Sequence, residues 1–448
     1  MKTSLSAATA RQATEGLRRA ELDFARHYPG LGANGSGERQ PVHSFYGGAH
    51  LFRSDSIPKL GSVALRALET YAPEPAQLTA VLGLPEGLGE TLHGRVAEKL
   101  RREPIEDYRI DFEDGYGHRA DEEEDGHAVA AARETAAALD QGTLPSSFGI
   151  RIKALTGETR ERAVRTLDLY LTALVARTGG ALPPGFVITL PKAVFPEQME
   201  ALAGLCEGLE AALSLPAGAL RLEIMVEAPQ AVVGPGGQVA LPRLVAAGKG
   251  RCRAAHFGAY DYTAGCDITA AHQTLAHPAC DFARQVMQVS LSGTGVWLVD
   301  GATTTLPIAP HRNPSSAEQA AENREVVHRA WRLHYDSIRR SLTQGFYQSW
   351  DLHPAQLIPR YAAVHAFFLE DLDGQAERLR NFVRQAAQAT RVGEVFDDAA
   401  TGQGLLNSFL RAVHSGALSE EEALEKSGLT LEELRERSFL KILGNRRG

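Results

Sequence analysis

The feature that most constrains the fold is an alternation of short apolar segments with longer helical segments along most of the chain. The short segments are rich in Val, Ile and Phe, and the segments between them are rich in Ala and Leu, as in amphipathic helices. The predicted strands are residues 41–46, 107–113, 148–153, 186–191, 222–227, 254–259, 296–300 and 345–352. Strands that alternate with helices indicate βα units and a parallel α/β sheet, and eight such units predict closure into a TIM-type (β/α)₈ barrel.

The eight predicted units divide the chain into three regions. Residues 1–40 are predicted to form an amphipathic helix and a loop, and residues 41–359 are predicted to form the barrel. Because strand signals stop after Pro359, residues 360–448 are predicted to be a C-terminal extension of four or five helices. Such an extension would cover an active site or contact another subunit.

Three connecting segments have signatures of their own. The glycine-rich residues 30–37 (GLGANGSG) predict a loop, and residues 54–102 are long enough for two or three helices between the first two strands. Residues 234–237 (GPGG) lie between two valine-containing segments and predict the turn of a small hairpin.

The composition is that of a globular protein with an acidic balance. The 448 residues include 47 Lys and Arg against 55 Asp and Glu, which gives a formal net charge of −8, and no long basic block occurs. This pattern argues against nucleic acid as a partner. No stretch of about 18 apolar residues predicts a membrane span, and residues 1–25 lack the apolar core of a secretory signal. None of the four cysteines forms a C-x-x-C pair, so we expect a protein of the reducing cytoplasm.

Charged residues stand at the end of almost every predicted strand. In a TIM barrel the functional site lies at the carboxyl ends of the strands, whereas a charge in the packed layers of the barrel is costly. A shared polar mouth therefore explains the pattern best. The charged and histidine residues at or just after strand ends are Asp111, Glu113, Asp114, Arg151, Lys153, Lys192, Glu227, Asp261, Asp300, Asp351 and His353.

Several carboxylates that converge with few bases predict a divalent cation. Mg²⁺, or alternatively Mn²⁺, prefers oxygen ligands and takes one or two protein carboxylates together with waters. Glu227 and Asp261, which follow neighbouring strands, are the predicted direct ligands. Glu113 and Asp114 are predicted to hold metal-bound waters. Such an ion would polarise a substrate carbonyl and stabilise an enolate.

The other strand-end residues are predicted to act on a small carboxylate substrate. Arg151 is expected to hold the substrate carboxylate with two parallel hydrogen bonds, and Lys192 and Asp300 are further predicted substrate-binding residues. His353 is a candidate general base, as are a metal-bound water and an acidic residue of the C-terminal helices. Each of these residues also has a structural explanation when taken alone, as a helix cap, a turn or one half of an ion pair.

Six short motifs follow one another between residues 107 and 356 and are specific as an ordered set. They are residues 111–114 (DFED), 151–153 (RIK), 190–192 (LPK), 226–229 (VEAP), 257–262 (FGAYDY) and 352–356 (LHPAQ). Together they resemble the motifs of the HpcH/HpaI aldolase and citrate lyase β-subunit superfamily. Residues 109–117, 293–301 and 350–356 further resemble an uncharacterised bacterial subgroup of it.

The resemblance implies a TIM barrel, an Mg²⁺-dependent lyase or aldolase acting on a 2-oxo acid or an acyl thioester, and a homo-oligomer. It also implies Glu227 and Asp261 as the metal ligands. The sequence departs from the family pattern at Lys153, where the family has Asn, and in the first strand, which contributes His43 and Tyr46.

Three other hypotheses stay open at the level of sequence. A malate-synthase-like Claisen condensation uses the same enolate as a lyase in the joining direction. A Schiff-base aldolase would use Lys153 or Lys192, although the surrounding carboxylates favour a protonated lysine. The third hypothesis is a barrel without catalytic activity, used as a binding or regulatory subunit, since a TIM barrel alone does not specify chemistry.

Overall fold

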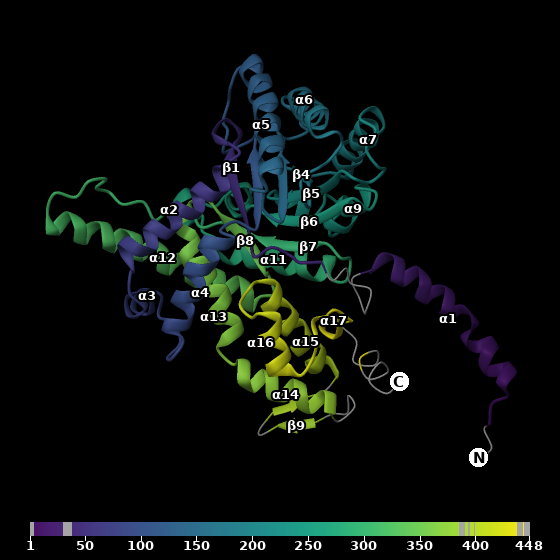
Figure 1. The fold of residues 1–448 in the computed structure, drawn as a ribbon. Coiled ribbons are helices and arrows are strands. Elements are labelled where there is room, and N and C mark those ends of the chain that lie inside the picture. Colours follow the sequence, from purple (N-terminus) through teal and green to yellow (C-terminus); the bar gives the residue numbers. More distant parts are fainter. Residues whose placement is uncertain are drawn as a thin grey trace.

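Eight parallel strands close into one barrel in chain order, each paired with the next and β8 with β1 (Figure 1). This computed structural model describes residues 4–29, 38–384, 390–392, 395–397, 399–436 and 442. The strands are β1 (His43–Gly48), β2 (Asp107–Asp111), β3 (Ser147–Arg151), β4 (Val187–Leu190), β5 (Arg221–Val226), β6 (Cys252–Phe257), β7 (Trp297–Asp300) and β8 (Gln348–Asp351). The predicted (β/α)₈ barrel is therefore confirmed, and every strand overlaps its predicted segment.

Helices surround the barrel and precede and follow it in the chain. The helices up to β6 are α1 (Ala7–His27), α2 (Ser56–Tyr71), α3 (Pro75–Leu82), α4 (Gly89–Arg102), α5 (Asp121–Gln141), α6 (Arg160–Thr178), α7 (Pro196–Ala212), α8 (Pro229–Val232) and α9 (Leu241–Ala247). The later helices are α10 (Ala259–Gly265), α11 (Pro278–Leu291), α12 (Ala317–Thr343), α13 (Leu357–Leu369), α14 (Leu372–Arg384), α15 (Ala399–His414), α16 (Glu420–Ser427) and α17 (Leu431–Glu436). No helix in the described ranges is long and apolar enough to span a membrane.

The predicted connections have the expected form. Three helices, α2 to α4, lie between β1 and β2. Val233 and Val239 form an antiparallel bridge, closed by a 2.8 Å hydrogen bond from the Gly234 amide to the Gln238 carbonyl oxygen. The predicted loop at residues 30–37 lies outside the described residues.

On β2, β3 and β4 the outward face is apolar and packs under the helices. Ile110, Ile150 and Ile188 are successive register partners on β2, β3 and β4, and all three are fully buried. β-branched residues suit this position because they are stiff and fill the space between a sheet and its helices. Both ends of α5 have typical helix-terminal residues. It begins with four acidic residues and ends at Gly142, which has the left-handed conformation that favours glycine.

The interior of the barrel contains a network of charged and polar side chains, unlike the Val, Ile and Leu layers that usually fill a TIM barrel. Arg109 donates to Glu223 at 2.8 and 3.1 Å and to Asp107, and Thr189 donates to Glu223 at 2.9 Å. All four side chains are buried. Because each charge has an opposite partner and aligned hydrogen bonds, the network is compatible with burial.

The C-terminal helices pack against the end of the barrel at which the strands begin. The Arg411 guanidinium of α15 lies 3.7 Å from the ring centroid of Tyr347 and donates to Gln40 at 3.3 Å, and these two residues precede β8 and β1. Figure 1 shows α14 to α17 together on this side of the molecule. The described helices of the extension therefore lie away from the mouth of their own barrel.

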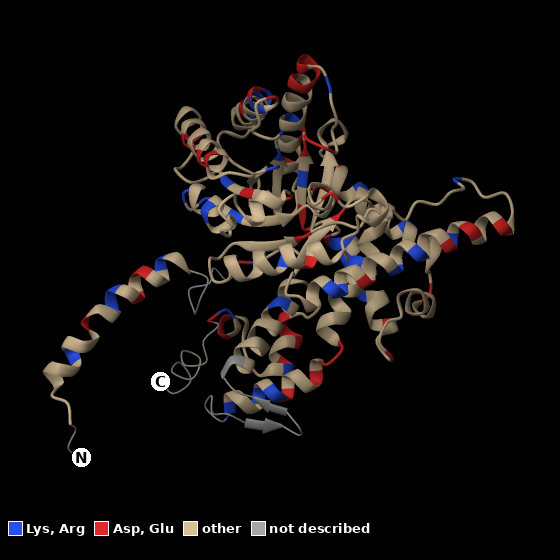
Figure 2. Ribbon diagram, turned by 180° about the vertical axis from the view of Figure 1, so that it is seen from behind, with Lys and Arg blue, Asp and Glu red and all other residues tan. Residues whose placement is uncertain are grey.

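Two further features refine the predicted domain organisation. The predicted boundary between residues 359 and 360 falls inside α13, which follows β8 and packs on α12 and α4 as a helix of the barrel. Strands do recur after it, since β9 (Thr390–Val392) and β10 (Val395–Asp397) pair antiparallel. At the other end of the chain, α1 has no buried residue and extends away from the barrel (Figure 1). Basic and acidic residues are interspersed over the barrel and the C-terminal helices (Figure 2).

Candidate functional site

The end of β3 places the Arg151 guanidinium in the barrel mouth beside the end of β2. Its Nε and Nη2 atoms donate to the two carboxylate oxygens of Asp111 at 2.7 and 2.6 Å, and both side chains are buried. Burial raises the pKa of Asp111, but Arg151 and the backbone amides of Glu113 and Gly115 outweigh it, so this pKa lies below its ordinary value. Asp111 is therefore a charged partner that fixes the plane of the guanidinium.

The Nη1 atom of the same guanidinium faces the acidic residues that follow β2. Nη1 of Arg151 lies 3.2 Å from Glu113 Oε2 and 3.8 Å from Asp114 Oδ2. Because Asp111 takes the Nε–Nη2 edge, the predicted paired contact with a substrate carboxylate has only the Nη1–Nη2 edge to use. The Glu113 side chain is 10% exposed and that of Asp114 is 61% exposed, so Glu113 lies deeper in the mouth.

Lys192 lies among four carboxylates. Its Nζ atom is 2.6 Å from Glu113 Oε1, 3.5 Å from Asp261 Oδ2 and 3.7 Å from Asp114 Oδ1, and its backbone amide donates to Glu227 Oε1 at 2.5 Å. Its backbone φ of 51° is in the left-handed region that non-glycine residues seldom adopt. Burial lowers the pKa of Lys192, but Glu227 and Glu113 outweigh burial and raise the pKa above its ordinary value. Lys192 is thus an ammonium ion, which disfavours its use as a Schiff-base nucleophile.

Glu227, the residue after β5, is a buried carboxylate with too little positive charge around it. Burial is the largest influence on its pKa, which rises to about 8 although Lys192 and Arg151 oppose the rise. Asp261 in the first turn of α10 adds to the rise, and its own side chain is 46% exposed. A Cβ atom at Gly258 would lie 2.5 Å from the Glu227 Cβ and 2.8 Å from Oε2, so only glycine leaves this carboxylate its space.

These residues fit a hard divalent cation. The donor set consists of carboxylate oxygens. A cation beside Glu227 would supply the positive charge that stabilises the ionised form of this buried carboxylate. Within the part of the chain that the structure describes, no group of three or more His, Cys, Asp or Glu side chains has a metal-binding arrangement. Glu227 and Asp261 would be the two protein ligands, a number that Mg²⁺ commonly takes with waters completing its shell.

The structure thus brings most of the predicted site residues together at the carboxyl ends of β2 to β6. We refer to this group as the mouth cluster, which consists of Asp111, Glu113, Asp114, Arg151, Lys192, Glu227 and Asp261.

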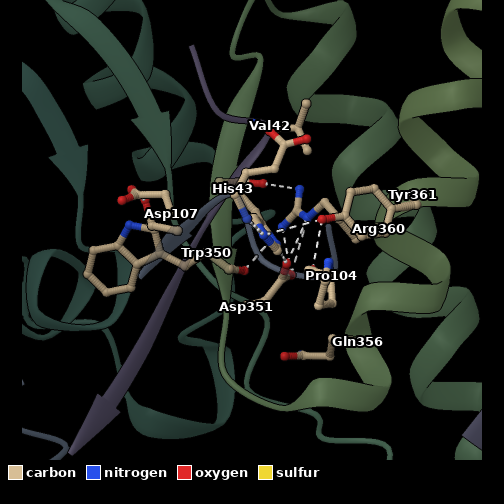
Figure 3. A network of polar contacts seen from close by, with 12 residues as sticks. Val42, His43, Pro104, Asp107, Trp350, Asp351, Gln356, Arg360 and Tyr361 are labelled. Carbon is tan, nitrogen blue, oxygen red and sulfur yellow. Dashed lines mark hydrogen bonds and ion pairs between the residues drawn. The ribbon is translucent and has the colours of Figure 1, made fainter. Parts of the chain in front are cut away.

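The structure does not bring Asp300 to the mouth cluster. Its buried carboxylate points outward from β7, where it lies 3.2 Å from Arg284 Nη1 and accepts a 2.5 Å hydrogen bond from Ser341 Oγ. Asp351 also points outward, on the opposite side of β8 from its neighbour Trp350 (Figure 3). Successive side chains of a strand alternate between its two faces, so a charged residue at a strand end reaches the mouth only in the inward register.

The outward side of β8 holds a buried polar network of its own (Figure 3). His43 Nδ1 and His334 Nε2 lie 2.6 and 2.7 Å from the Asp351 carboxylate, and Arg360 lies 2.8 Å from it. Burial raises the pKa of Asp351, but Arg360 and the two histidines outweigh it and hold the pKa well below its ordinary value. The network joins β1, β8, α12 and α13, so His43 ties elements together and does not line the mouth.

His353 and Lys153 lie after β8 and β3 and have partners outside the mouth cluster. His353 Nδ1 accepts from the Ala355 amide at 3.2 Å, and burial lowers the pKa of His353 below its ordinary value. Lys153 Nζ donates to the Phe112 carbonyl oxygen at 2.7 Å and lies 3.0 Å from Glu124. In the described ranges neither side chain makes a hydrogen bond or ion pair to a side chain of the mouth cluster. The role of His353 as a base stays a prediction.

Sequence reasoning treated Asp111 as part of a motif and did not assign its partner. The signal that could have identified it is the register, because Asp111 and Arg151 are Cα partners across β2 and β3 and both point inward. Strand register follows from the inward and outward pattern of whole strands, so it needs the alignment of two segments about 40 residues apart.

Solved structures with a related fold include a citrate lyase from Burkholderia xenovorans LB400. Its TM-score is 0.56 at 18% identity, over 86% of this chain and 95% of that chain. A lead(II) complex of the Haloferax volcanii malate synthase has a TM-score of 0.43 at 14% identity, over 88% of this chain and 98% of that chain. At such identities the citrate lyase shows the fold alone.

The sequence comparisons identify the family. No curated protein matches the chain. One family model, described as "Domain of unknown function (DUF6986)", matches residues 17–442 and so covers nearly the whole chain. The protein therefore belongs to the DUF6986 family.

Proposed function

We propose that the protein is a divalent-metal-dependent enzyme that makes or breaks a carbon–carbon bond next to a carbonyl group, by way of an enolate. The proposed donor substrate is a small 2-oxo acid or an acyl thioester. The observation that carries the proposal is the convergence of Glu227, Asp261 and Arg151 at the carboxyl ends of β3, β5 and β6. A TIM-barrel enzyme carries its chemistry at this end of the strands.

Each part of the mouth cluster has a role in this chemistry. Glu227 and Asp261 would hold Mg²⁺ or Mn²⁺, which when bound supplies positive charge that stabilises an enolate oxygen. Arg151 would bind the substrate carboxylate through its Nη1–Nη2 edge, in a plane that Asp111 fixes. Glu113 would orient water in the mouth, and Lys192 limits the negative charge that the four carboxylates create together.

Two kinds of side chain are candidates for the proton-transferring base. An acidic residue of the described C-terminal helices lies away from its own mouth, because α15 packs at the opposite end of the barrel. Such a residue would have to come from another copy, which agrees with our proposal of a homo-oligomer. His353 is the proposed base within the chain, since its lowered pKa keeps the ring neutral near pH 7. All four cysteines are free, as suits the proposed cytoplasmic location.

The direct test is deuterium exchange at the methyl group of pyruvate, followed by proton NMR in D₂O with Mg²⁺ or with a chelator. We expect metal-dependent exchange that falls on the order of 100-fold or more in Glu227→Gln, because the carboxylate that holds the cation is lost. Glu207→Gln, which removes an exposed carboxylate of α7 paired with Lys249, is the matched control and should exchange like the wild type.

Acetyl thioesters and oxaloacetate serve as further donors in the same assay. Exchange that is equally fast with chelator, or in Glu227→Gln, would contradict a metal-stabilised enolate. Absence of exchange with every donor, together with no Mg²⁺ binding by calorimetry, would instead favour the barrel without catalytic activity.

A further inference from the structure

We infer that Tyr46 and Trp350 are positioning residues for Arg151: they form an aromatic shelf that holds its guanidinium at the angle needed to receive a substrate carboxylate. This inference rests on the proposed function for the role of Arg151 as the carboxylate anchor. Neither ring belongs to the mouth cluster, and neither is explained by the ligands and bases of the proposed reaction.

The two rings lie against each other and against Arg151. Their centroids are 4.5 Å apart with planes inclined by 29°, which is a stacked pair. The Arg151 Cζ atom lies 5.0 Å from the Tyr46 centroid and 6.0 Å from the Trp350 centroid. A guanidinium at such distances from an aromatic face is attracted to it, and more strongly where water is excluded. Tyr46 and Arg151 are both buried.

The shelf and Asp111 restrain different motions of the same group. Asp111 engages the Nε–Nη2 edge and therefore fixes rotation within the guanidinium plane. It does not prevent the plane from tilting about that edge. The rings of Tyr46 and Trp350, contributed by β1 and β8, oppose this tilt. With both restraints in place, Arg151 presents its remaining edge in one direction, so less entropy is lost when a carboxylate binds.

His256 of β6 contacts both rings of the shelf. The Trp350 indole N–H donates to His256 Nδ1 at 3.0 Å, and the Tyr46 hydroxyl lies 3.4 Å from the same atom. An Nδ1 atom that accepts from an indole carries no proton, so the ring proton is on Nε2. This Nε2 atom lies 3.2 Å from Glu223 Oε2, without an aligned hydrogen bond.

The support continues into the interior of the barrel. Glu223 accepts two hydrogen bonds from Arg109 and one from Thr189, and all of these side chains are buried. A column of polar contacts thus runs from the interior network through His256 to the shelf and then to Arg151. This gives the unusual polar interior a purpose in the mouth, since it fixes the orientation of the rings on which Arg151 rests.

The test measures binding of oxalate, a planar dicarboxylate, in the presence of Mg²⁺ by isothermal titration calorimetry. We expect Trp350→Leu and Tyr46→Leu to raise the dissociation constant on the order of tenfold, because the guanidinium loses its shelf. Trp350→Phe keeps an aromatic face and should recover most of the affinity, which a purely structural role of the indole would not predict. Trp297→Leu is the matched control. It removes a ring at the start of β7 whose centroid lies 4.1 Å from the Arg253 guanidinium of β6, and it should leave oxalate binding unchanged.

A second measurement separates failure of this inference from failure of the proposed function. In a double-mutant cycle of Trp350→Leu and Arg151→Met, urea unfolding reports whether the two side chains interact, with no ligand present. We expect a coupling of about threefold or more in the folding equilibrium constant. If the wild type does not bind oxalate, the proposed function fails and the cycle decides the inference alone. Additive effects in the cycle, or wild-type oxalate affinity in Trp350→Leu, would overturn the inference.

Discussion

At the scale of single residues, one glycine determines how close the chain after β6 comes to the candidate metal ligand that follows β5. Gly258 has a φ of −99°, which any residue adopts, so its backbone is unstrained and only the missing side chain matters. The Cβ atom of any other residue would overlap the Glu227 side chain, and nothing flexible lies between them to move away.

We therefore predict that Gly258→Ala displaces the Glu227 carboxylate. The expected results are Mg²⁺ affinity lower by about tenfold or more and a loss of about 1–3 kcal/mol in the free energy of unfolding from overpacking. Calorimetry measures the first and urea titration the second. Gly208→Ala is the matched control, because an added Cβ in this α7 position meets no atom within 4 Å. It should stabilise the protein by about 0.5–1 kcal/mol, as in other helices. Unchanged Mg²⁺ affinity in Gly258→Ala would argue against Glu227 as a ligand.

At the scale of elements, a single buried carboxylate joins β1, β2 and α4 at the end of the barrel where the strands begin. Glu106, just before β2, accepts from the Val42 amide at 2.8 Å. Its Oε1 atom lies 2.6 Å from Lys99 Nζ of α4 and 2.7 Å from Arg39 Nη2. Burial raises the pKa of Glu106, but Lys99 and Arg39 outweigh burial and lower the pKa from an ordinary 4.5 to about 2.

This depressed pKa predicts how stability depends on pH. A carboxyl whose pKa is lower in the folded state stabilises the fold fully above its unfolded pKa, and the stabilisation is lost as the pH falls from there toward the folded pKa. For Glu106 the window lies between about pH 4.5 and 2, and the contribution is on the order of 3 kcal/mol. We expect Glu106→Gln to be less stable at neutral pH and to lose less stability than the wild type on acidification through this window.

Urea titrations between about pH 5 and 3, over the upper part of that window, measure the free energy of unfolding for this comparison. The matched control is Glu98→Gln, which removes an exposed glutamate of α4, the helix that carries Lys99. This variant should retain the wild-type pH dependence. A Glu106→Gln variant whose stability falls with pH as steeply as that of the wild type would show that other carboxylates dominate acid unfolding.

At the scale of the whole molecule, the order of the elements was predictable from sequence. The direction of the side chains at the strand ends, inward or outward, was predictable only in part. The eight strands follow from period and composition, which act locally. Arg151 and Glu227 were predicted from their positions at strand ends, and the structure places both side chains in the inward register. Asp300 also stands at the end of a strand, but its side chain points outward. That direction depends on the register of β7 with β6 and β8, which tertiary structure sets. The place of the C-terminal helices, at the far end of the barrel from the mouth, likewise depends on packing that no local pattern encodes.

That placement leads to a prediction about cooperativity. The buried apolar side chains of the barrel and of the C-terminal helices form one continuous core, in which Val364 and Phe368 of α13 and Leu406 and Phe409 of α15 take part. A shared core makes the extension unfold with the barrel, because neither part keeps its buried surface without the other. We therefore expect a single unfolding transition for the intact chain, with the same midpoint by near- and far-ultraviolet circular dichroism.

Leu406→Ala tests two expectations: that the extension unfolds together with the barrel, and that a change in the extension leaves the distant mouth unaffected. Truncation of a fully buried leucine removes about 2–5 kcal/mol, and the loss should lower the midpoint of the whole transition while Mg²⁺ affinity of the folded protein stays within about twofold, since Leu406 lies beyond the start of the strands. Leu174→Ala in α6, also fully buried, is the matched control within the barrel and should lower the same single midpoint. A second, earlier transition in Leu406→Ala alone would mean that the extension is an independent unit. A large change in Mg²⁺ affinity would instead mean that the two ends of the barrel communicate through its polar interior.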